Sequence, residues 1–225
     1  MNLKQKVLMT LGTVGVAAAV AGGGSFASFN AQTTNPNTFA TGTLVMSNKV
    51  NTATACLSTA AGVGITTNVA TCDALFNLTV KKPGDSGTAD LTIKNEGSVA
   101  ASLLNTFTSG CTGADASGQT YHGTGDPCAA VQIYVQQWDS AAHTTPTACL
   151  YGGAAVTNTC DFSGASKTIA DFATNYTSSG AGLTVTGGLA AGSSDFFTIG
   201  VKLPTSADNT YQGRQATVGL SWYMQ

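Results

Sequence analysis

Charged side chains are scarce in this sequence. Asp, Glu, Lys and Arg make up only 9% of its 225 residues, and the formal net charge is −2, whereas about 25% of residues are charged in an ordinary globular domain. A protein that follows a phosphate backbone needs clustered Lys and Arg. The composition therefore argues against a nucleic-acid binder and leaves solubility to Ser, Thr, Asn and Gln.

Enzymatic motifs are lacking as well. The sequence has no H-E-x-x-H, the motif that supplies two zinc-binding histidines and a glutamate base, and neither a G-x-S-x-G elbow nor a Walker loop. Its two histidines, His122 and His143, lie in Gly- and Thr-rich segments without a neighbouring Glu, which is typical of surface loops. Asp115, Asp126 and Asp139 lie in or beside the same segments but without the ordered spacing of a calcium loop. We therefore predict no catalytic residue, no metal site and no cofactor.

Segments suited to long helices are missing too, because 27 residues are Gly and each Gly inside a helix costs about 1 kcal/mol relative to Ala. Apolar residues instead alternate with polar ones, as in strands that bury one face. The alternating runs lie within residues 44–46, 76–80, 91–93, 131–135, 197–203 and 218–224. One segment, 169–176, has apolar residues at helical spacing and predicts a short helix capped by Ser166 or Thr168. We expect an all-β fold, a two-sheet jelly-roll sandwich with this one short helix.

Cysteine is present in an even number, and all six cysteines follow the N-terminal segment. The C-x-x-C spacing of many zinc sites does not occur, and an even count behind an export signal predicts disulfides formed in an oxidising compartment. Six cysteines allow 15 pairings. Short separations favour Cys56–Cys72, Cys111–Cys128 and Cys149–Cys160, each closing one long loop, with a gain on the order of 3 kcal/mol per loop.

The N-terminus has the form of an export signal. A short basic segment is followed by mostly apolar residues 7–20, by three glycines and by the small residues Ser25 and Ala27. A signal peptidase reads this order, so we predict cleavage between Ala27 and Ser28. The alternative is a membrane anchor formed by residues 7–27, which weakly apolar Gly and Ala and the lack of a following basic cluster disfavour.

The chain thus divides into a signal peptide (residues 1–27, removed), an N-terminal arm (28–38) and a β domain (39–225). The arm is polar and offers almost no apolar face to its own domain. Such a segment either is a flexible tail or becomes ordered when it binds another molecule.

Five motifs along the chain are more specific. They are G-G-G-S-F-A-S-F-N at 22–30, N-T-F-A-T-G-T-L at 37–44, K-P-G-D at 82–85, I-K-N-E-G-S at 93–98 and N-T-Y-Q-G-R-Q-A-T-V-G-L-S-W at 209–222. With these motifs the chain resembles the TasA/camelysin family of secreted bacterial proteins. The resemblance implies a jelly-roll fold, cleavage at Ala27/Ser28 by a dedicated SipW-type signal peptidase, and assembly into extracellular fibres of biofilm-matrix or pilus type.

The resemblance also implies a mode of assembly, in which the freed arm of one subunit inserts as a donor strand into the next subunit. The implied donor strand consists of Ser28, Phe29, Asn30, Ala31, Gln32, Thr33, Thr34, Asn35, Pro36 and Asn37. Ten extended residues span roughly 33 Å, and strand addition supplies main-chain hydrogen bonds and side-chain pockets. A head-to-tail contact of this kind does not close on itself and builds a filament.

The expected partners are copies of the chain itself, the signal peptidase during export, and an anchor or initiator subunit, without specific nucleic acid and without stable membrane insertion after cleavage. Two other functions stay open. Some relatives carry a metallopeptidase label, which makes a cell-surface metallopeptidase the first alternative. The second is a monomeric surface adhesin that displays its disulfide-stapled loops. The expected location is secreted, in the extracellular matrix or at the cell surface.

Overall fold

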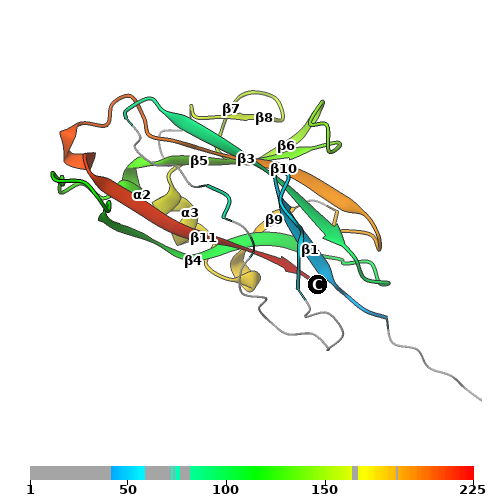
Figure 1. The fold of residues 1–225 in the computed structure, drawn as a ribbon. Helices are drawn as coiled ribbons and strands as arrows, with labels where there is room; N and C mark the ends of the chain where they lie inside the picture. Colours follow the sequence, from blue (N-terminus) through cyan, green and yellow to red (C-terminus); the bar gives the residue numbers. More distant parts are fainter. Residues whose placement is uncertain (1–41, 59–71, 73, 77–81, 164–166, 186) are drawn as a thin grey trace, which may run out of the picture. The chain divides into compact units, whose positions relative to one another are not determined.

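The computed structural model describes residues 42–58, 72, 74–76, 82–163, 167–185 and 187–225. The chain divides into two units, Met1–Ala40 and Thr41–Gln225, of which the first lies outside the described residues. The second unit is built mostly of antiparallel strands with a few short helices (Figure 1). The all-β prediction is therefore confirmed at the level of class.

The largest sheet has six strands in the order β2-β1-β3-β10-β5-β6. Its members are β1 (Met46–Val50), β2 (Cys56–Leu57), β3 (Ser86–Asn95), β5 (Gln132–Trp138), β6 (Pro146–Tyr151) and β10 (Ser194–Lys202). The turn before β3 forms as predicted, because the Asp85 amide donates to the Lys82 carbonyl and Gly84 takes the positive φ that Pro-Gly turns need. Of the predicted run at 76–80, residues 77–80 lie outside the described residues.

A second sheet has three strands in the order β11-β4-β9, and a third has two. The three-stranded sheet consists of β4 (Leu104–Asp115), β9 (Leu183–Val185) and β11 (Arg214–Met224), and the two-stranded sheet of β7 (Gly153–Val156) and β8 (Thr159–Asp161). All pairings between these strands are antiparallel. A turn of 3₁₀ helix, η1 (Ser179–Ala181), precedes β9, and another, η2 (Asn209–Tyr211), precedes β11.

One apolar core joins the two larger sheets. The six-stranded sheet contributes the fully buried Leu91, Ile93, Phe197 and Ile199, and the three-stranded sheet contributes Leu104. The predicted alternation along β11 holds, since Trp222 is buried and Val218, Leu220 and Met224 pack against the core. Burial of such side chains stabilises a fold by about 1.5–3 kcal/mol each.

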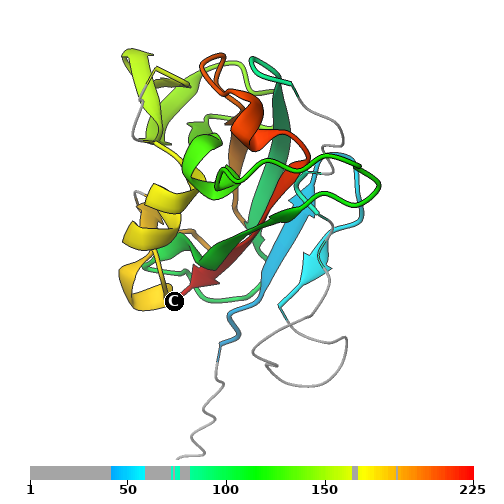
Figure 2. The ribbon, with the colours of Figure 1, turned by 90° about the vertical axis from the view of Figure 1, so that its left-hand side faces the viewer.

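Two short helices lie beside the three-stranded sheet, on the side away from β1 in Figure 2. Helix α3 (Ile169–Asn175) is the predicted helix, and Thr168 caps it in a capping box with Asp171. Helix α2 (Pro127–Ala130) was not predicted, although Asp126 caps it and Pro127 occupies its first turn, both of which are helix-start signals. No helix among the described residues is long and apolar enough to span a membrane.

The disulfides join the three pairs that the sequence favoured. The Cα atoms are 5.4 Å apart in Cys56–Cys72, 6.0 Å in Cys111–Cys128 and 4.9 Å in Cys149–Cys160. The idea that each pair closes a loop was wrong in part, because Cys111, Cys149 and Cys160 lie in β4, β6 and β8. Small polar residues dominate these strands and hide the apolar alternation that marks a strand in sequence.

Candidate functional site

The residues predicted to be cleaved and to act as donor strand, Ala27 and Ser28 to Asn37, lie outside the described residues. Candidate interaction surfaces lie on the domain that follows them. Because most side chains on this domain are uncharged, the geometry of its sheet edges carries the most information about partners.

The six-stranded sheet has short or covered edges. At one end stands β2, which is only two residues long and is tied by the Cys56–Cys72 disulfide. At the other end stands β6, which begins with Pro146 and is joined to β8 by the Cys149–Cys160 disulfide. Short edges, proline and covering segments are the means by which proteins prevent further strand pairing.

The three-stranded sheet ends in a long edge of different character. Within the described part of the chain, the eleven residues of β11 pair only with β4. The strand contains no proline and one charged residue, Arg214, at its first position. That charge is already engaged, because Arg214 forms an ion pair with Asp115 on β4. From Gln215 to Met224 the edge lacks the charges that normally discourage addition of another strand.

Side chains along β11 divide cleanly between core and solvent. Val218, Leu220 and Trp222 face the core, whereas Thr217 and Ser221 are exposed. The pairing with β4 shifts in register around Gly219, where an added Cβ would meet only open space. The C-terminal end is held in place, because the Gln225 amide donates to the Leu103 carbonyl and the Gln225 carbonyl accepts from the Ser102 amide. One edge of β11 is thus fixed to β4. Its other edge has no strand paired with it among the described residues.

Two polar side chains face inward on the larger sheet, and each has one oxygen without a hydrogen bond to any described residue. Asn48 on β1 and Asp195 on β10 both stand directly opposite Ile93 of β3, so the three side chains share one face. Among the described residues, Asn48 Oδ1 and Asp195 Oδ2 are buried acceptors with no hydrogen bond. Burial raises the pKa of Asp195, and a hydrogen bond with Gln137 acts in the opposite direction. Unpaired buried acceptors cost about 1–3 kcal/mol each, so a donor that reached them would stabilise the domain.

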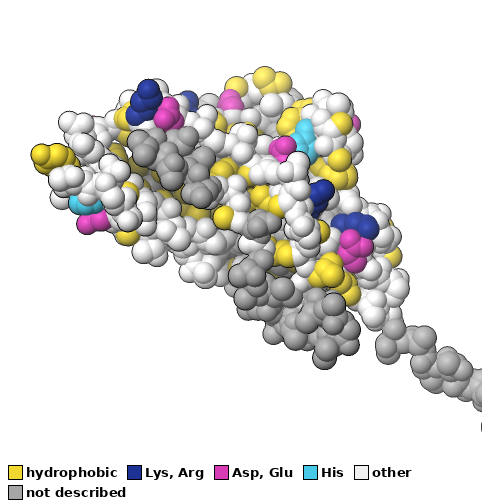
Figure 3. All heavy atoms as spheres, in the orientation of Figure 1, with side chains coloured by type: hydrophobic (Ala, Val, Ile, Leu, Met, Phe, Trp, Pro, Cys, Tyr) yellow, Lys and Arg dark blue, Asp and Glu magenta, His cyan; other side chains and the backbone are white. Residues whose placement is uncertain are grey.

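The two histidines belong to separate clusters. His122 Nδ1 lies 2.8 Å from the Gly213 carbonyl and 3.8 Å from Asp115, whereas His143 Nδ1 lies 3.2 Å from Asp90. Figure 3 shows histidine at two distinct places, each beside an acidic side chain. His143 is less exposed than a loop histidine was expected to be, with 18% of its side chain accessible.

A zinc-peptidase centre does not fit the residues that the structure describes. Such a centre needs two histidines and a third ligand converging on one ion, with a carboxylate base beside it. No group of three His, Cys, Asp or Glu side chains within the described ranges is placed to hold a metal ion. Asp126 caps α2 and Asp139 accepts hydrogen bonds from its own loop, so the aspartates considered for calcium do not converge either.

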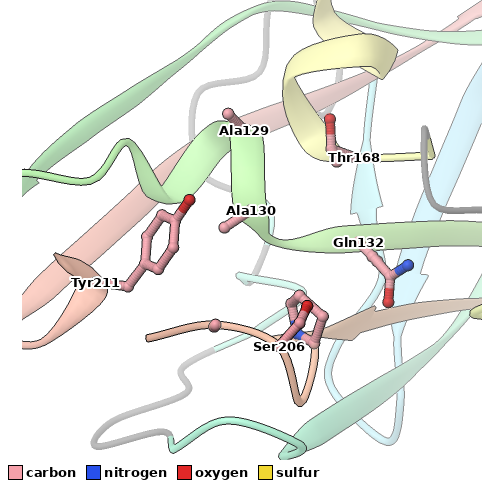
Figure 4. A pocket seen from close by; sticks show the side chains of 8 residues that line it. Ala129, Ala130, Gln132, Thr168, Ser206 and Tyr211 are labelled. Carbon is pink, nitrogen blue, oxygen red and sulfur yellow. The ribbon is translucent and has the colours of Figure 1, made fainter. Parts of the chain in front are cut away.

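A pocket of about 250 Å³ lies between α2, the N-cap of α3 and the segment 204–211 (Figure 4). Ala129, Ala130, Thr168, Ser206 and Tyr211 line it together with Gln132, Pro204 and Ala207. The Thr168 hydroxyl already bonds to Asp171 in the capping box. Without a charged side chain or a nucleophile paired with a base, the lining offers no catalytic chemistry.

Sequence reasoning identified β11 as a strand but not as a sheet edge. Its composition pointed away from an edge, because a long strand without proline and with its single charge at the first residue is unusual at an edge. Position in the sheet, however, depends on which strands pair, and the sequence does not specify that.

The matched family agrees with the resemblance drawn from the sequence motifs. A family described as camelysin metallo-endopeptidase matches residues 2–121, which is more than half of the 225 residues. The match runs from the N-terminal segment through β1, β3 and β4 and ends before α2. Comparison with curated proteins gave no match.

Proposed function

The chain belongs to the camelysin metallo-endopeptidase family, and on this basis we propose that it is an exported structural subunit that polymerises into extracellular fibres. In this proposal, cleavage between Ala27 and Ser28 frees the arm 28–38, whose residues 28–37 pair as a donor strand with a neighbouring copy. We assign the sandwich to the jelly-roll class, whose two sheets accept such an extra strand at an edge.

The observation that carries the proposal is the long, uncharged edge of β11. A strand of eleven residues extends over roughly 36 Å, and a ten-residue arm over roughly 33 Å, so the two lengths match. Main-chain N–H and C=O groups along a free edge form hydrogen bonds with any extended chain of suitable length. The three-stranded sheet, which faces a sheet of six, would become a sheet of four.

The polar groups of the arm and of the domain are complementary, which supports contact between copies. The arm carries four Asn and Gln side chains and no charge, and each carboxamide supplies two N–H donors. The acceptor domain holds unpaired oxygens at Asn48 and Asp195 on its inner face. An arm rich in amides remains soluble before assembly and gives donors to buried acceptors afterwards.

Assembly of this kind is directional. The arm lies at one end of the chain and the acceptor edge on the domain, so each copy donates once and accepts once, and the contact repeats without closing. The partners are therefore other copies, the signal peptidase before assembly, and an anchor or initiator subunit that begins the fibre.

Deletion of residues 28–37 from the mature chain tests the proposal. The truncated chain should fold and remain monomeric by light scattering, and negative-stain microscopy should show no filaments. The mature chain beginning at Ser28, with no added tag on that end, should form filaments under the same conditions. Filaments of normal length from the truncated chain would exclude the arm as donor, and a mature chain that stays monomeric at high concentration would favour an adhesin.

The family description favours a metallopeptidase as the second candidate. In that case the purified chain should hold stoichiometric zinc and cleave protein substrates in a manner that a chelator abolishes. A metal content well below one ion per chain, together with no proteolysis, would remove this candidate.

A further inference from the structure

The loop between β5 and β6 places His143 over the outer face of the six-stranded sheet. Beneath it, Asp90 of β3 and Thr198 of β10 stand directly opposite each other in the ladder. Trp138, at the end of β5, completes the group by donating from its indole nitrogen to the Thr198 hydroxyl at 2.9 Å. Three segments distant in sequence, around residues 90, 138–143 and 198, thus meet at one point on the sheet.

Three donor atoms form a compact triangle in this cluster. His143 Nδ1 is 3.2 Å from Asp90 Oδ1 and 3.3 Å from Thr198 Oγ1, and Thr198 Oγ1 is 2.8 Å from Asp90 Oδ1. Ligands around a first-row metal ion, each bound at about 2.1 Å, are separated by roughly 3.0–3.4 Å. The three atoms are therefore spaced almost as they would be when bound to one ion.

The backbone and the ring stack hold His143 in this position. His143 has a φ of 51°, a conformation that few residues other than Gly adopt, and its amide donates to the Ser140 carbonyl. The imidazole stacks on the Trp138 indole, with ring centroids 5.4 Å apart and planes within 9° of parallel. A ligand side chain fixed in advance loses little conformational entropy when it binds.

We propose that His143 Nδ1, Asp90 Oδ1 and Thr198 Oγ1 bind one divalent first-row transition-metal ion, of the class of Zn²⁺ or Ni²⁺. Imidazole with carboxylate and hydroxyl oxygens suits such ions, whereas Mg²⁺ and Ca²⁺ prefer sites made of oxygen alone. In the bound state the Nδ1 lone pair faces the ion, so the imidazole proton resides on Nε2, and the Thr198 hydroxyl proton turns away from Asp90. Water completes the coordination, since 56% of the Asp90 side chain is accessible.

The other histidine supplies a matched comparison. His122 also lies near an aspartate, but that carboxylate, Asp115, is engaged by Arg214. A guanidinium beside the carboxylate opposes a second cation at the same place. The cluster of His143 is therefore proposed to bind a metal ion, and the cluster of His122 is not. The proposal depends neither on filament formation nor on peptidase activity.

Titration of the untagged full chain with Ni²⁺ tests the site by calorimetry and by tryptophan fluorescence. The chain has two tryptophans; Trp138 stacks on His143, and Trp222 is buried in the core. Ni²⁺ should bind saturably with one ion per chain and quench part of the emission. His143→Asn, which retains a residue suited to positive φ, and Asp90→Asn should each weaken binding at least tenfold. His122→Asn should leave the affinity unchanged.

Three further variants separate ligation from folding. Thr198→Ser keeps the hydroxyl and should retain affinity, whereas Thr198→Val should lose it, and Trp138→Phe should bind Ni²⁺ by calorimetry without the quenching. The proposal is wrong if the unmodified chain shows no saturable binding below about 1 mM, or if His143→Asn, folded by circular dichroism, binds as the unmodified chain does. Equal loss in the His122 and His143 variants would also exclude the triangle as the site.

Discussion

Phe197 and Trp222 lie ring against ring between the two larger sheets, with centroids 4.7 Å apart and ring planes tilted by 38°. Phe197 comes from β10 in the centre of the six-stranded sheet, and Trp222 comes from β11 at the edge of the other. This contact anchors the edge strand to the core. An acceptor strand that is held on its inner face can pair along its free side without being displaced.

Trp222→Ala should reduce the free energy of unfolding by about 3–5 kcal/mol, because truncation of a buried aromatic side chain removes its burial and leaves a cavity. Urea titration followed by circular dichroism measures the change, and the midpoint should fall while the slope stays constant. Tyr121→Ala is the control, since 75% of Tyr121 is accessible and its removal should change stability by no more than about 0.5 kcal/mol.

Elements with strong apolar periodicity could be predicted from the sequence. The runs in β10 and β11 alternate without interruption, and the helix at 169–175 has both its spacing and its capping residue. In each case local pattern and tertiary burial agree, which is why the prediction succeeds. The favoured disulfide pairs rested on sequence separation, and the structure contains the same pairs.

Strand β4 could not be predicted, because its buried positions are partly polar. Thr106 and Thr108 are fully buried, and the Thr106 hydroxyl donates to the Ser221 carbonyl across the ladder. Threonine residues whose buried hydroxyls are hydrogen-bonded behave as core residues. A sequence pattern that counts threonine as polar, however, assigns such a segment to a loop. The clustering of His143 with Asp90 and Thr198 was missed for a related reason, since it depends on register between strands that the sequence does not specify.

Gln136→Leu should destabilise the domain by about 3 kcal/mol or more. Gln136 is buried, and its amide nitrogen shares its two hydrogens among the carbonyls of Gln137, Ala148 and Asn158, which all lie within hydrogen-bond distance, while its carbonyl accepts from the Cys160 amide. Leucine leaves these backbone groups without that partner, at about 1–3 kcal/mol for each that stays unsatisfied. The free energy of unfolding is measured by denaturant titration and compared with that of Gln215→Leu, which adds leucine at an exposed position on β11. The comparison separates the loss of the Gln136 hydrogen bonds from a general effect of adding leucine. Similar stability of the two variants would contradict the expected role of Gln136.

Asp195→Asn should stabilise the domain near pH 7 and have no such effect near pH 3. Burial raises the pKa of Asp195 above its ordinary 3.8, so ionisation is less favourable in the folded state. The ionised carboxylate therefore lowers the free energy of unfolding. This destabilisation is absent below the unfolded-state pKa and complete above the folded-state pKa, and asparagine, which does not ionise, removes it. Unfolding midpoints measured from pH 3 to pH 7.5 should therefore diverge as the pH rises.

Asp161→Asn supplies the control of opposite sign. Hydrogen bonds from Ser163 lower the pKa of Asp161, so its stabilising contribution is present above the unfolded-state pKa and is lost as the pH falls through the lower folded-state pKa. This variant should be less stable than the unmodified chain near pH 7. If Asp195→Asn and Asp161→Asn shifted stability in the same direction at pH 7, burial would not be what controls Asp195.

Thr217→Lys combined with Ser221→Lys should prevent filament growth by the mature chain without unfolding the domain. Both side chains are exposed on β11, and lysine on an edge strand discourages a further strand from pairing. Thr112→Lys is the control, because Thr112 is exposed and stands directly opposite Thr217, but on β4, the strand with which β11 already pairs. Filament length by negative-stain microscopy should collapse in the double variant and stay normal in the control. Equal shortening in both would point to added charge alone and would remove β11 as the acceptor, whereas normal filaments in both would place the acceptor on a different edge.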